Sequence, residues 1–493
     1  MELLKIAKNV CNCESNEIFP KMPGVRIKFS IDKSIPSVRN AYYNIPAAYR
    51  DGARRRLEVM EARGIIEKVT SAPRWISGMS AVPKGKSDFQ LVVNMGAPNR
   101  AIKREYFRLP LIDEIKVKLH GAKFFSKLDL SDAFYHLELD DESRYLTTFL
   151  SESGMFRFTR LMFGVNCAPE IFQREMTRIL KNTKNIIVYI DDVLVYAETL
   201  EDLRKSVAEV LQILRLNNVT INSSKCEFDK TKIVFLGHEL SVKGFNIETS
   251  KIRDIQKFRH PETASELKSS LGLASFISPY IRNFADISSP LWAATSAPQW
   301  TWGNEQKKAF ELVKERIMRS TVSLGYFSER DRTILYTDAS PHALGAVLVQ
   351  EDDKGMPRII SFASKSLTAT EKKYAQNQRE ALSAVWAVKH FSYFLLGRRF
   401  VLRTDAQGMS FILCRSREGS KRALTRADGW AYVLVLTITM YNVSGVARIS
   451  RIPHPACIAA MMRLSMNMSA LGKYVVWNRI PPNSSQMKKY VNL

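Results

Sequence analysis

Long apolar runs are absent from this chain of 493 residues. Its longest apolar stretches, such as Ala431–Met440, fall far short of the roughly 20 residues that a membrane-spanning helix requires. The opening residues Met1–Lys5 have neither the basic start nor the apolar run of a secretory signal. We therefore expect no secretory signal and no membrane partner.

Cysteine and acidic residues are also scarce. Cys11 and Cys13 have no second pair at zinc-ligand spacing, so the six cysteines are expected to be reduced thiols in a reducing compartment. Lys and Arg number 73 against 49 Asp and Glu, which gives a formal charge of +24. This balance favours a polyanionic partner, because neutralised phosphates release counterions. A generic solvated basic surface is the alternative.

Two adjacent carboxylates, Asp191 and Asp192, stand between two apolar, β-branched runs. The pattern predicts a hairpin with strands at Ile186–Ile190 and Val193–Ala197 and with the two acids as its loop. Acids held together at such a tip repel each other unless a cation neutralises them. The pattern therefore favours a divalent-metal site over a solvated Asp-Asp turn.

A third carboxylate strengthens this interpretation. Phe124–Leu128 is typical of a strand, and it delivers Asp129 at its end. Three carboxylates placed in this way can hold two Mg²⁺ ions roughly 3.5–4 Å apart, the arrangement for in-line phosphoryl transfer. One ion would activate a primer 3′-hydroxyl and the other would stabilise the pyrophosphate; Mn²⁺ can substitute.

With these segments and several short motifs, the chain resembles the reverse transcriptases of gypsy-type LTR retrotransposons, relatives of retroviral reverse transcriptases. Phe125–Leu130 and the Tyr189–Asp192 hairpin occur in the family's order. The other matching segments are Arg160–Gly164, Ala168–Gln173, Lys225–Phe228, Phe235–His238 and Leu271–Ala274. Together they are far more specific than the hairpin alone.

The resemblance implies an α+β fold: a right-hand polymerase with fingers, palm and thumb, then a connection and an RNase H-like α/β domain. It implies that a backbone carbonyl of Leu130 joins the metal ligands. It places Phe134 against the sugar 2′-position, with core packing as the alternative. The other implied nucleotide contacts are Asp132, Ala133, Phe163 and Gly164. The implied primer grip is Phe235, Leu236, Gly237 and His238.

A second set of carboxylates lies downstream. Arg332–Ser340 is typical of a strand and carries Asp338, and Arg399–Asp405 is typical of another strand ending in an acid. Between them, the predicted helix Glu371–Phe394 carries Glu380. This order resembles the ribonuclease H fold, whose carboxylates bind two Mg²⁺ and cleave RNA paired with DNA. We expect Asp338, Glu380 and Asp405 to be catalytic metal ligands.

The fingers depart from the family. The basic turn around Lys84 suits a triphosphate, although an ordinary exposed lysine is the alternative. Gln90, however, stands where the family has a basic residue, and Gly96 replaces another arginine. Because an amide cannot supply the charge of a guanidinium, these changes predict weakened or lost polymerisation.

The tail also departs. Residues 431–493 contain no Asp or Glu, and the family's closing Asn-Ile-Ala-Asp pattern, which supplies a fourth carboxylate, is absent. Back-translation of Ala447–Ile458 with suitable codons recovers Glu-Asn-Ile-Ala-Asp in another reading frame. We therefore hypothesise a frameshift near residues 431–435 and expect weak or absent hybrid cleavage.

The predicted division of the chain has six parts. These are an N-terminal extension (1–40), fingers and palm (41–204), primer grip and thumb (205–290), connection (291–330), an RNase H-like domain (331–430) and an atypical tail (431–493). The resemblance implies an RNA template, a DNA primer strand, an RNA–DNA hybrid, a tRNA primer and dNTPs as partners. It implies a location in the cytoplasm, within a virus-like particle for a complete element, or in the nucleus. The alternative function is an inactive remnant that binds nucleic acid.

Overall fold

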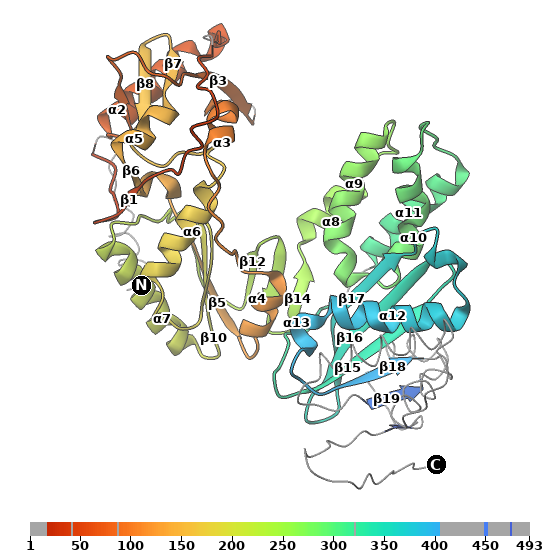
Figure 1. Cartoon of the computed structure of the whole chain (residues 1–493). Helices are drawn as coiled ribbons and strands as arrows, with labels where there is room; N and C mark the ends of the chain where they lie inside the picture. Colours follow the sequence, from red (N-terminus) through yellow and green to blue (C-terminus); the bar gives the residue numbers. More distant parts are fainter. Residues whose placement is uncertain are drawn as a thin grey trace. The chain divides into compact units, whose positions relative to one another are not determined.

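The structure, a computed structural model, describes residues 17–40, 43–85, 88–319 and 322–404, and the backbone of two short strands at 448–451 and 474–475. The chain divides into two compact units, Met1–Ile233 and Val234–Leu493, called unit 1 and unit 2 below. Both contain helices and sheets, which confirms the α+β class (Figure 1). No helix within the described ranges is long and apolar enough to cross a membrane.

A five-stranded sheet, called the fingers sheet, forms one part of unit 1 (Figure 1). Its strands, in spatial order, are β2 (Ile66–Lys68), β8 (Gly154–Phe158), β7 (Phe149–Ser151), β3 (Ser77–Lys84) and β4 (Asp88–Val93). The apolar spacing of Ala47–Ile66 is typical of a helix, but the helix is shorter: a 3₁₀ turn at Ala47–Tyr49 leads into α2 (Arg50–Ala62). Gly64, with φ +65°, follows the end of the helix, and strand β2 begins two residues later.

A four-stranded sheet, called the palm sheet, forms the other part of unit 1. Its order is β11 (Glu227–Lys230), β5 (Phe124–Asp129), β10 (Asp192–Ala197) and β9 (Ile186–Tyr189). Two helices pack against it: α6 (Ala168–Ile179) on β9 and α7 (Leu200–Leu216) on β10 and β5. The apolar residues that recur at helical spacing along α7 are fully buried, for example Leu203 and Leu211. The segment Val219–Ile221 is typical of a strand in sequence, but Ile221 makes only an isolated bridge to Leu130.

Shorter elements complete unit 1. They are β1 (Arg26–Ile27), β6 (Glu138–Leu139), α3 (Gly96–Ala101), α4 (Ile112–Lys118) and α5 (Asp141–Arg144). One buried apolar cluster runs from Leu57 of α2 through Phe149 of the fingers sheet to Leu128 and Val195 of the palm sheet. The two sheets of this unit therefore share a core.

Unit 2 begins with a small sheet and a helical segment. The sheet is β12 (Lys232–Phe235), β13 (His238–Ser241) and β14 (Gly244–Ile247). The helices are α8 (Thr249–Gln256), α9 (Ala264–Ile277), α10 (Phe284–Ser296) and α11 (Asn304–Met318). The segment Ile233–Leu240, which is typical of a strand in sequence, is thus a hairpin of β12 and β13.

A six-stranded sheet forms the rest of unit 2, and α12 (Gln376–His390) lies across it (Figure 1). The order is β17 (Pro357–Ser366), β16 (Ala343–Glu351), β15 (Arg332–Ala339), β18 (Phe400–Thr404), β19 (Arg448–Arg451) and β20 (Tyr474–Val475). The helix predicted at Glu371–Phe394 is divided into a 3₁₀ turn (Glu371–Lys373), α12 and α13 (Ser392–Leu395), because Ala375 is extended.

Candidate functional site

The carboxylate hairpin turns one residue earlier than predicted. Tyr189 pairs with Asp192, so the loop is Ile190 and Asp191, and the predicted Asp191-Asp192 loop is wrong. Ile190 has φ +53°, which resembles the first position of a type II′ turn, where glycine is usual. As a result, Asp192 is the first residue of β10 and stands directly opposite Asp129 in the ladder between β10 and β5.

A buried glutamine holds this strained turn in place. The Ile190 N–H donates to Oε1 of Gln173 at 2.7 Å, and Nε2 of Gln173 donates to the Val188 carbonyl at 2.9 Å. On the other side, the Leu130 N–H donates to the Asp191 carbonyl at 3.0 Å. A β-branched residue with positive φ is costly, so these bonds maintain the conformation that presents Asp191.

The three carboxylates form a crowded electrostatic site. Burial, followed by the charges of Asp192 and Asp129, raises the pKa of Asp191 to about 6. Burial also raises the pKa of Asp192, against the opposing effect of Lys127, whose Nζ lies 3.4 Å from Asp192 Oδ1. Lys225 Nζ lies 3.5 Å from Asp129 Oδ1. Two lysines therefore balance part of the charge in this arrangement.

The donor set suits a hard divalent cation. All the side-chain donors are carboxylate oxygens, and Oδ1 of Asp191 is buried with no hydrogen-bond partner. Within the described ranges, no three His, Cys, Asp or Glu side chains are already gathered to hold a metal ion. Asp129 and Asp192 each lie close to a lysine ammonium, with which a bound cation would compete.

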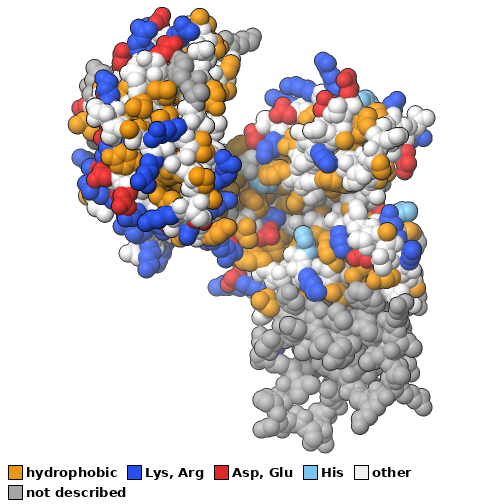
Figure 2. Space-filling model, turned by 45° about the horizontal axis from the view of Figure 1, so that its top comes forward, with side chains coloured by type: hydrophobic (Ala, Val, Ile, Leu, Met, Phe, Trp, Pro, Cys, Tyr) orange, Lys and Arg blue, Asp and Glu red, His pale blue; other side chains and the backbone are white. Residues whose placement is uncertain are grey.

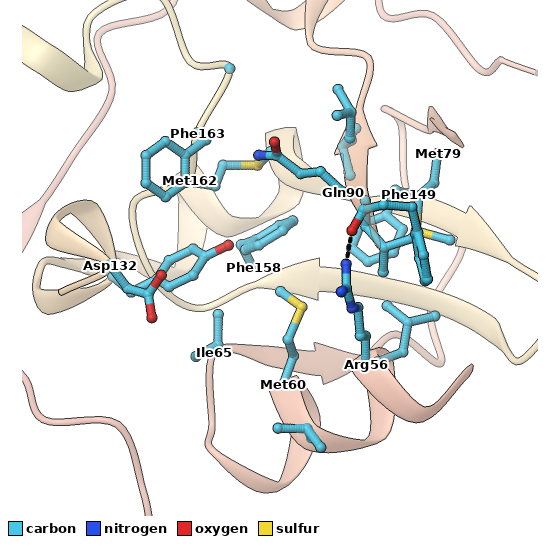
Figure 3. Close-up of a pocket in the computed structure, with 18 of the residues that line it drawn as sticks. Arg56, Met60, Ile65, Met79, Gln90, Asp132, Phe149, Phe158, Met162 and Phe163 are labelled. Carbon is cyan, nitrogen blue, oxygen red and sulfur yellow. Dashed lines mark hydrogen bonds between the residues drawn. The ribbon is translucent and has the colours of Figure 1, made fainter. Parts of the chain in front are cut away.

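Part of the predicted nucleotide site lines a cavity of about 640 Å³ in unit 1 (Figure 3). Lys84, Asp132, Phe163 and Gly164 line it, and so does Gln90. Ala133 and Phe134 do not line it. Phe134 is 7% exposed, and its ring centroid lies 4.7 Å from that of Phe163. Phe163 is 40% exposed, so it presents the aromatic surface and Phe134 supports it.

The same cavity contains basic residues that the sequence analysis missed. Arg55 and Arg56 of α2 and Arg63, just beyond its end, all line it. Arg56 and Arg63 are seven positions apart and therefore share a helix face, but no sequence pattern connects that face with Gln90. The shared cavity becomes evident only from the packing of α2 beneath the fingers sheet (Figure 3).

The predicted primer grip forms the hairpin between β12 and β13. Leu236 and Gly237 have φ +50° and +74°, as in a type I′ turn. Phe235 and His238 are 2% and 4% exposed, and His238 Nδ1 lies 2.8 Å from the Tyr280 hydroxyl. The side chains of Phe235 and His238 are therefore buried, whereas Leu236 and Gly237 at the turn are partly exposed.

The second carboxylate site is partly described. Asp338 on β15 is exposed, whereas Glu380 on α12 is 2% exposed. Ser383 Oγ donates to the Asp338 carbonyl at 2.8 Å and Gln376 Nε2 donates to the Ala339 carbonyl at 3.1 Å, so α12 is fixed to the strand at this point. Within the helix, Gln376 Nε2 also donates to Glu380 Oε1 at 2.7 Å. Asp405 and the proposed frameshift near residues 431–435 lie outside the described residues.

Comparison with known families agrees with this geometry. Residues 82–240 match the family described as "Reverse transcriptase (RNA-dependent DNA polymerase)". Residues 302–402 match the "RNase H-like domain found in reverse transcriptase". The second match therefore includes Asp338 and Glu380 and ends before Asp405.

Curated relatives are polyproteins of transposons. The retrovirus-related Pol polyprotein from transposon 297 of Drosophila melanogaster is 30% identical over 411 residues, which are 80% of this chain and 38% of that protein. The transposon Tf2-3 polyprotein of Schizosaccharomyces pombe is 28% identical over 70% of this chain and 26% of its own length. The chain spans less than half the length of these relatives.

Solved structures share the fold. A foamy viral protease–reverse transcriptase in complex with double-stranded DNA has a TM-score of 0.80 at 20% identity, over 92% of this chain and 78% of that one. A foamy viral protease–reverse transcriptase in complex with an RNA/DNA hybrid has a TM-score of 0.76 at 20% identity, over 98% of this chain and 62% of that one. These likenesses show the fold, and the two family matches together with the transposon relatives show that the chain belongs to the reverse transcriptase and RNase H region of LTR-retrotransposon Pol polyproteins.

Proposed function

We propose that the chain is an RNA-directed and DNA-directed DNA polymerase with an appended ribonuclease H. The observation that carries this proposal is the ladder pairing of Asp129 with Asp192, beside the partnerless buried oxygen of Asp191. Basic side chains spread over the face of unit 1 seen in Figure 2 support a nucleic-acid partner. The proposed partners are an RNA template, a DNA primer strand, their hybrid, a tRNA primer and dNTPs.

The polymerase residues have distinct proposed roles. Asp129, Asp191 and Asp192, with the Leu130 carbonyl, would hold Mg²⁺, or Mn²⁺ in its place. Such ions, when bound, lower the pKa of a primer 3′-hydroxyl and neutralise the departing pyrophosphate. Gln173 keeps Asp191 in position through the turn backbone. Phe163 offers an aromatic surface to the incoming nucleotide, and the backbone at Leu236 and Gly237 would approach the primer end.

The second site is proposed to hydrolyse the copied RNA. Asp338, Glu380 and Asp405 would hold the metal ions there. The domain limits given by the sequence remain proposals, as does a cytoplasmic, particle-associated or nuclear location.

Primer extension by the Asp191→Asn variant tests the polymerase assignment. The substitution keeps the side-chain shape but removes a ligand charge, so extension on RNA and DNA templates should fall below detection. Hybrid binding should be retained, because repulsion at the site decreases. Asp141→Asn is the matched control, since that side chain is 78% exposed on α5. An Asp191→Asn variant that extends primers at the parental rate would refute the polymerase assignment.

A second candidate function is an inactive remnant that binds nucleic acid. Gln90, Gly96 and the acid-free tail favour it. The parental chain would then retain a template–primer duplex without extending it at any dNTP or Mg²⁺ concentration.

A further inference from the structure

The proposed nucleotide cavity lacks a charge on the strand where the family carries one. Gln90 lies on β4 opposite Val82 of β3, and its side chain extends toward Met162 and Phe163 (Figure 3). Its amide can donate hydrogen bonds but carries no charge. Lys84, which also lines the cavity, is the residue of this hairpin whose charge could neutralise a phosphate. A triphosphate bound here would therefore need cations from another element.

Helix α2 supplies them on the opposite wall of the cavity. Arg56, Met60 and Arg63 are spaced i, i+4 and i+7, so they lie along one face, and all three line the cavity. At 1.5 Å per residue, Arg56 and Arg63 are separated by about 10 Å along the helix direction. Arg56 lies at the end of this helix face that contacts β4, at Asp88 and Phe89, the residues just before Gln90. It is thus an arginine in contact with the strand on which the charge is missing.

Arg56 is held in one conformation by several contacts. Its guanidinium lies 4.2 Å from the centroid of the Phe89 ring, donates through Nη1 to the Phe89 carbonyl, and donates through Nη2 to Asp88 Oδ1 at 2.5 Å. Figure 3 shows the Nη1 bond as a dashed line. A Cβ at Gly52 would come within 2.8 Å of the Phe89 ring, so glycine there lets the ring lie against α2. The guanidinium is therefore already ordered before a ligand arrives.

The Asp88 contact does not prevent a phosphate from binding. The side chains of Arg56 and Asp88 are 40% and 58% exposed, so water screens their attraction. A triphosphate carries several charges and accepts bidentate hydrogen bonds from a guanidinium. It can thus share the group with Asp88 or displace that carboxylate, while the contacts with Phe89 keep Arg56 beneath β4.

We propose that Arg56 supplies the triphosphate contact that Gln90 cannot make, so that the phosphate site of the incoming dNTP is completed from helix α2. This inference rests on the proposed polymerase function. It also alters the expectation from the sequence: Gln90 need not abolish polymerisation, because a cation from a different element can occupy the same cavity.

The test compares four variants with the parent: Arg56→Gln, Arg56→Lys, Gln90→Arg and the double variant Arg56→Gln/Gln90→Arg. Arg54→Gln is the matched control, because Arg54 is on the same helix, 57% exposed, and does not line the cavity. The first assay is steady-state primer extension with varied dNTP. The second uses a dideoxy-terminated primer and measures the dNTP concentration that half-stabilises the protein–template–primer complex, which requires no chemical step.

Arg56→Gln should raise the dNTP KM and the half-stabilising concentration roughly 10- to 100-fold, the effect of losing a charge-assisted hydrogen bond. The template–primer Kd should stay within twofold of the parent. Arg56→Lys should lie in between, and adding Gln90→Arg should restore most of the lost dNTP affinity. Melting curves check that every variant is folded.

Three results would overturn the proposal. One is an Arg56→Gln variant with parental dNTP dependence in both assays. Another is a change confined to template–primer affinity, which would assign Arg56 to the template strand. The third is a parental complex that no dNTP stabilises. Failure of the polymerase assignment is recognised separately, as a parent that is stabilised by dNTP but extends no primer.

Discussion

Replacing Gln173 with methionine should disable the polymerase without unfolding it. Methionine has a similar length and flexibility, but it cannot bond the Ile190 N–H or the Val188 carbonyl. Each lost hydrogen bond removes about 0.5–1.5 kcal/mol, and each buried group left unpaired costs about 1–3 kcal/mol. The positive φ of Ile190 adds strain of about 1–2 kcal/mol. The turn should therefore relax, and Asp191 should move with it.

A displacement of about 1 Å at a reacting centre can lower the rate about 10²-fold. We thus expect a fall of that order in single-turnover extension by Gln173→Met, with the template–primer Kd unchanged and a higher Mg²⁺ concentration needed for half-maximal rate. Gln212→Met, at an exposed position on α7, is the control.

A second substitution distinguishes positioning from general destabilisation. Ile190→Gly removes the cost of positive φ, so the double variant Gln173→Met/Ile190→Gly should recover part of the lost rate. Parental activity of Gln173→Met would refute the reasoning. So would a double variant as slow as Gln173→Met, because strain at Ile190 would then not be what Gln173 opposes.

Three other predictions follow from the same geometry. The pKa of Asp191 is raised to about 6 from an ordinary 3.8, so its ionisation destabilises the metal-free fold as pH rises from about 4 to about 6. Melting curves should show Asp191→Asn more stable than the parent at pH 7.5 and equally stable near pH 4. A difference in melting temperature at both pH values would contradict this. Phe134→Ala should admit ribonucleotides and, because Phe134 packs against Phe163 and Phe172, lower stability by about 3–5 kcal/mol; unchanged sugar selectivity in competition assays would leave Phe134 a core residue. Restoring the reading frame near residue 431 should raise hybrid cleavage and the melting temperature of the RNase H-like domain, whereas no change in either would mean that the tail is a genuine ending.

The sequence predicted the order of the strands that carry the polymerase carboxylates, because apolar runs next to acids are local signals. It placed the hairpin loop one residue late. The amino-acid sequence does not predict a positive φ at Ile190, since this turn lacks the usual glycine or asparagine. The preference of isoleucine for negative φ is overridden by Gln173, which lies 17 positions away and is part of a motif quoted only for its resemblance.

The residues that line the cavity show the same limit of prediction from sequence more clearly. Lys84 and Gln90 belong to one hairpin, so a sequence pattern could connect them. Arg56 is 34 positions before Gln90, on a helix of its own, and only tertiary packing through Phe89 and Gly52 brings it to the same space. The predicted contact of Phe134 with the sugar remains a prediction; the structure adds that its ring packs against Phe163, a placement that spacing from Asp129 could not reveal.

The pairing of Asp129 with Asp192 in the ladder between β10 and β5 constrains how this sequence can change over time. Six successive pairs, from Asp192–Asp129 to Ala197–Phe124, fix the alignment of β10 and β5. Replacing one apolar residue in either strand by another leaves that alignment in place. Inserting or deleting a single codon between Phe124 and Asp129, or between Asp192 and Ala197, would turn a carboxylate to the opposite face of the sheet. Substitutions of this kind therefore leave Asp129 and Asp192 paired, whereas a single small length change in these strands would separate them.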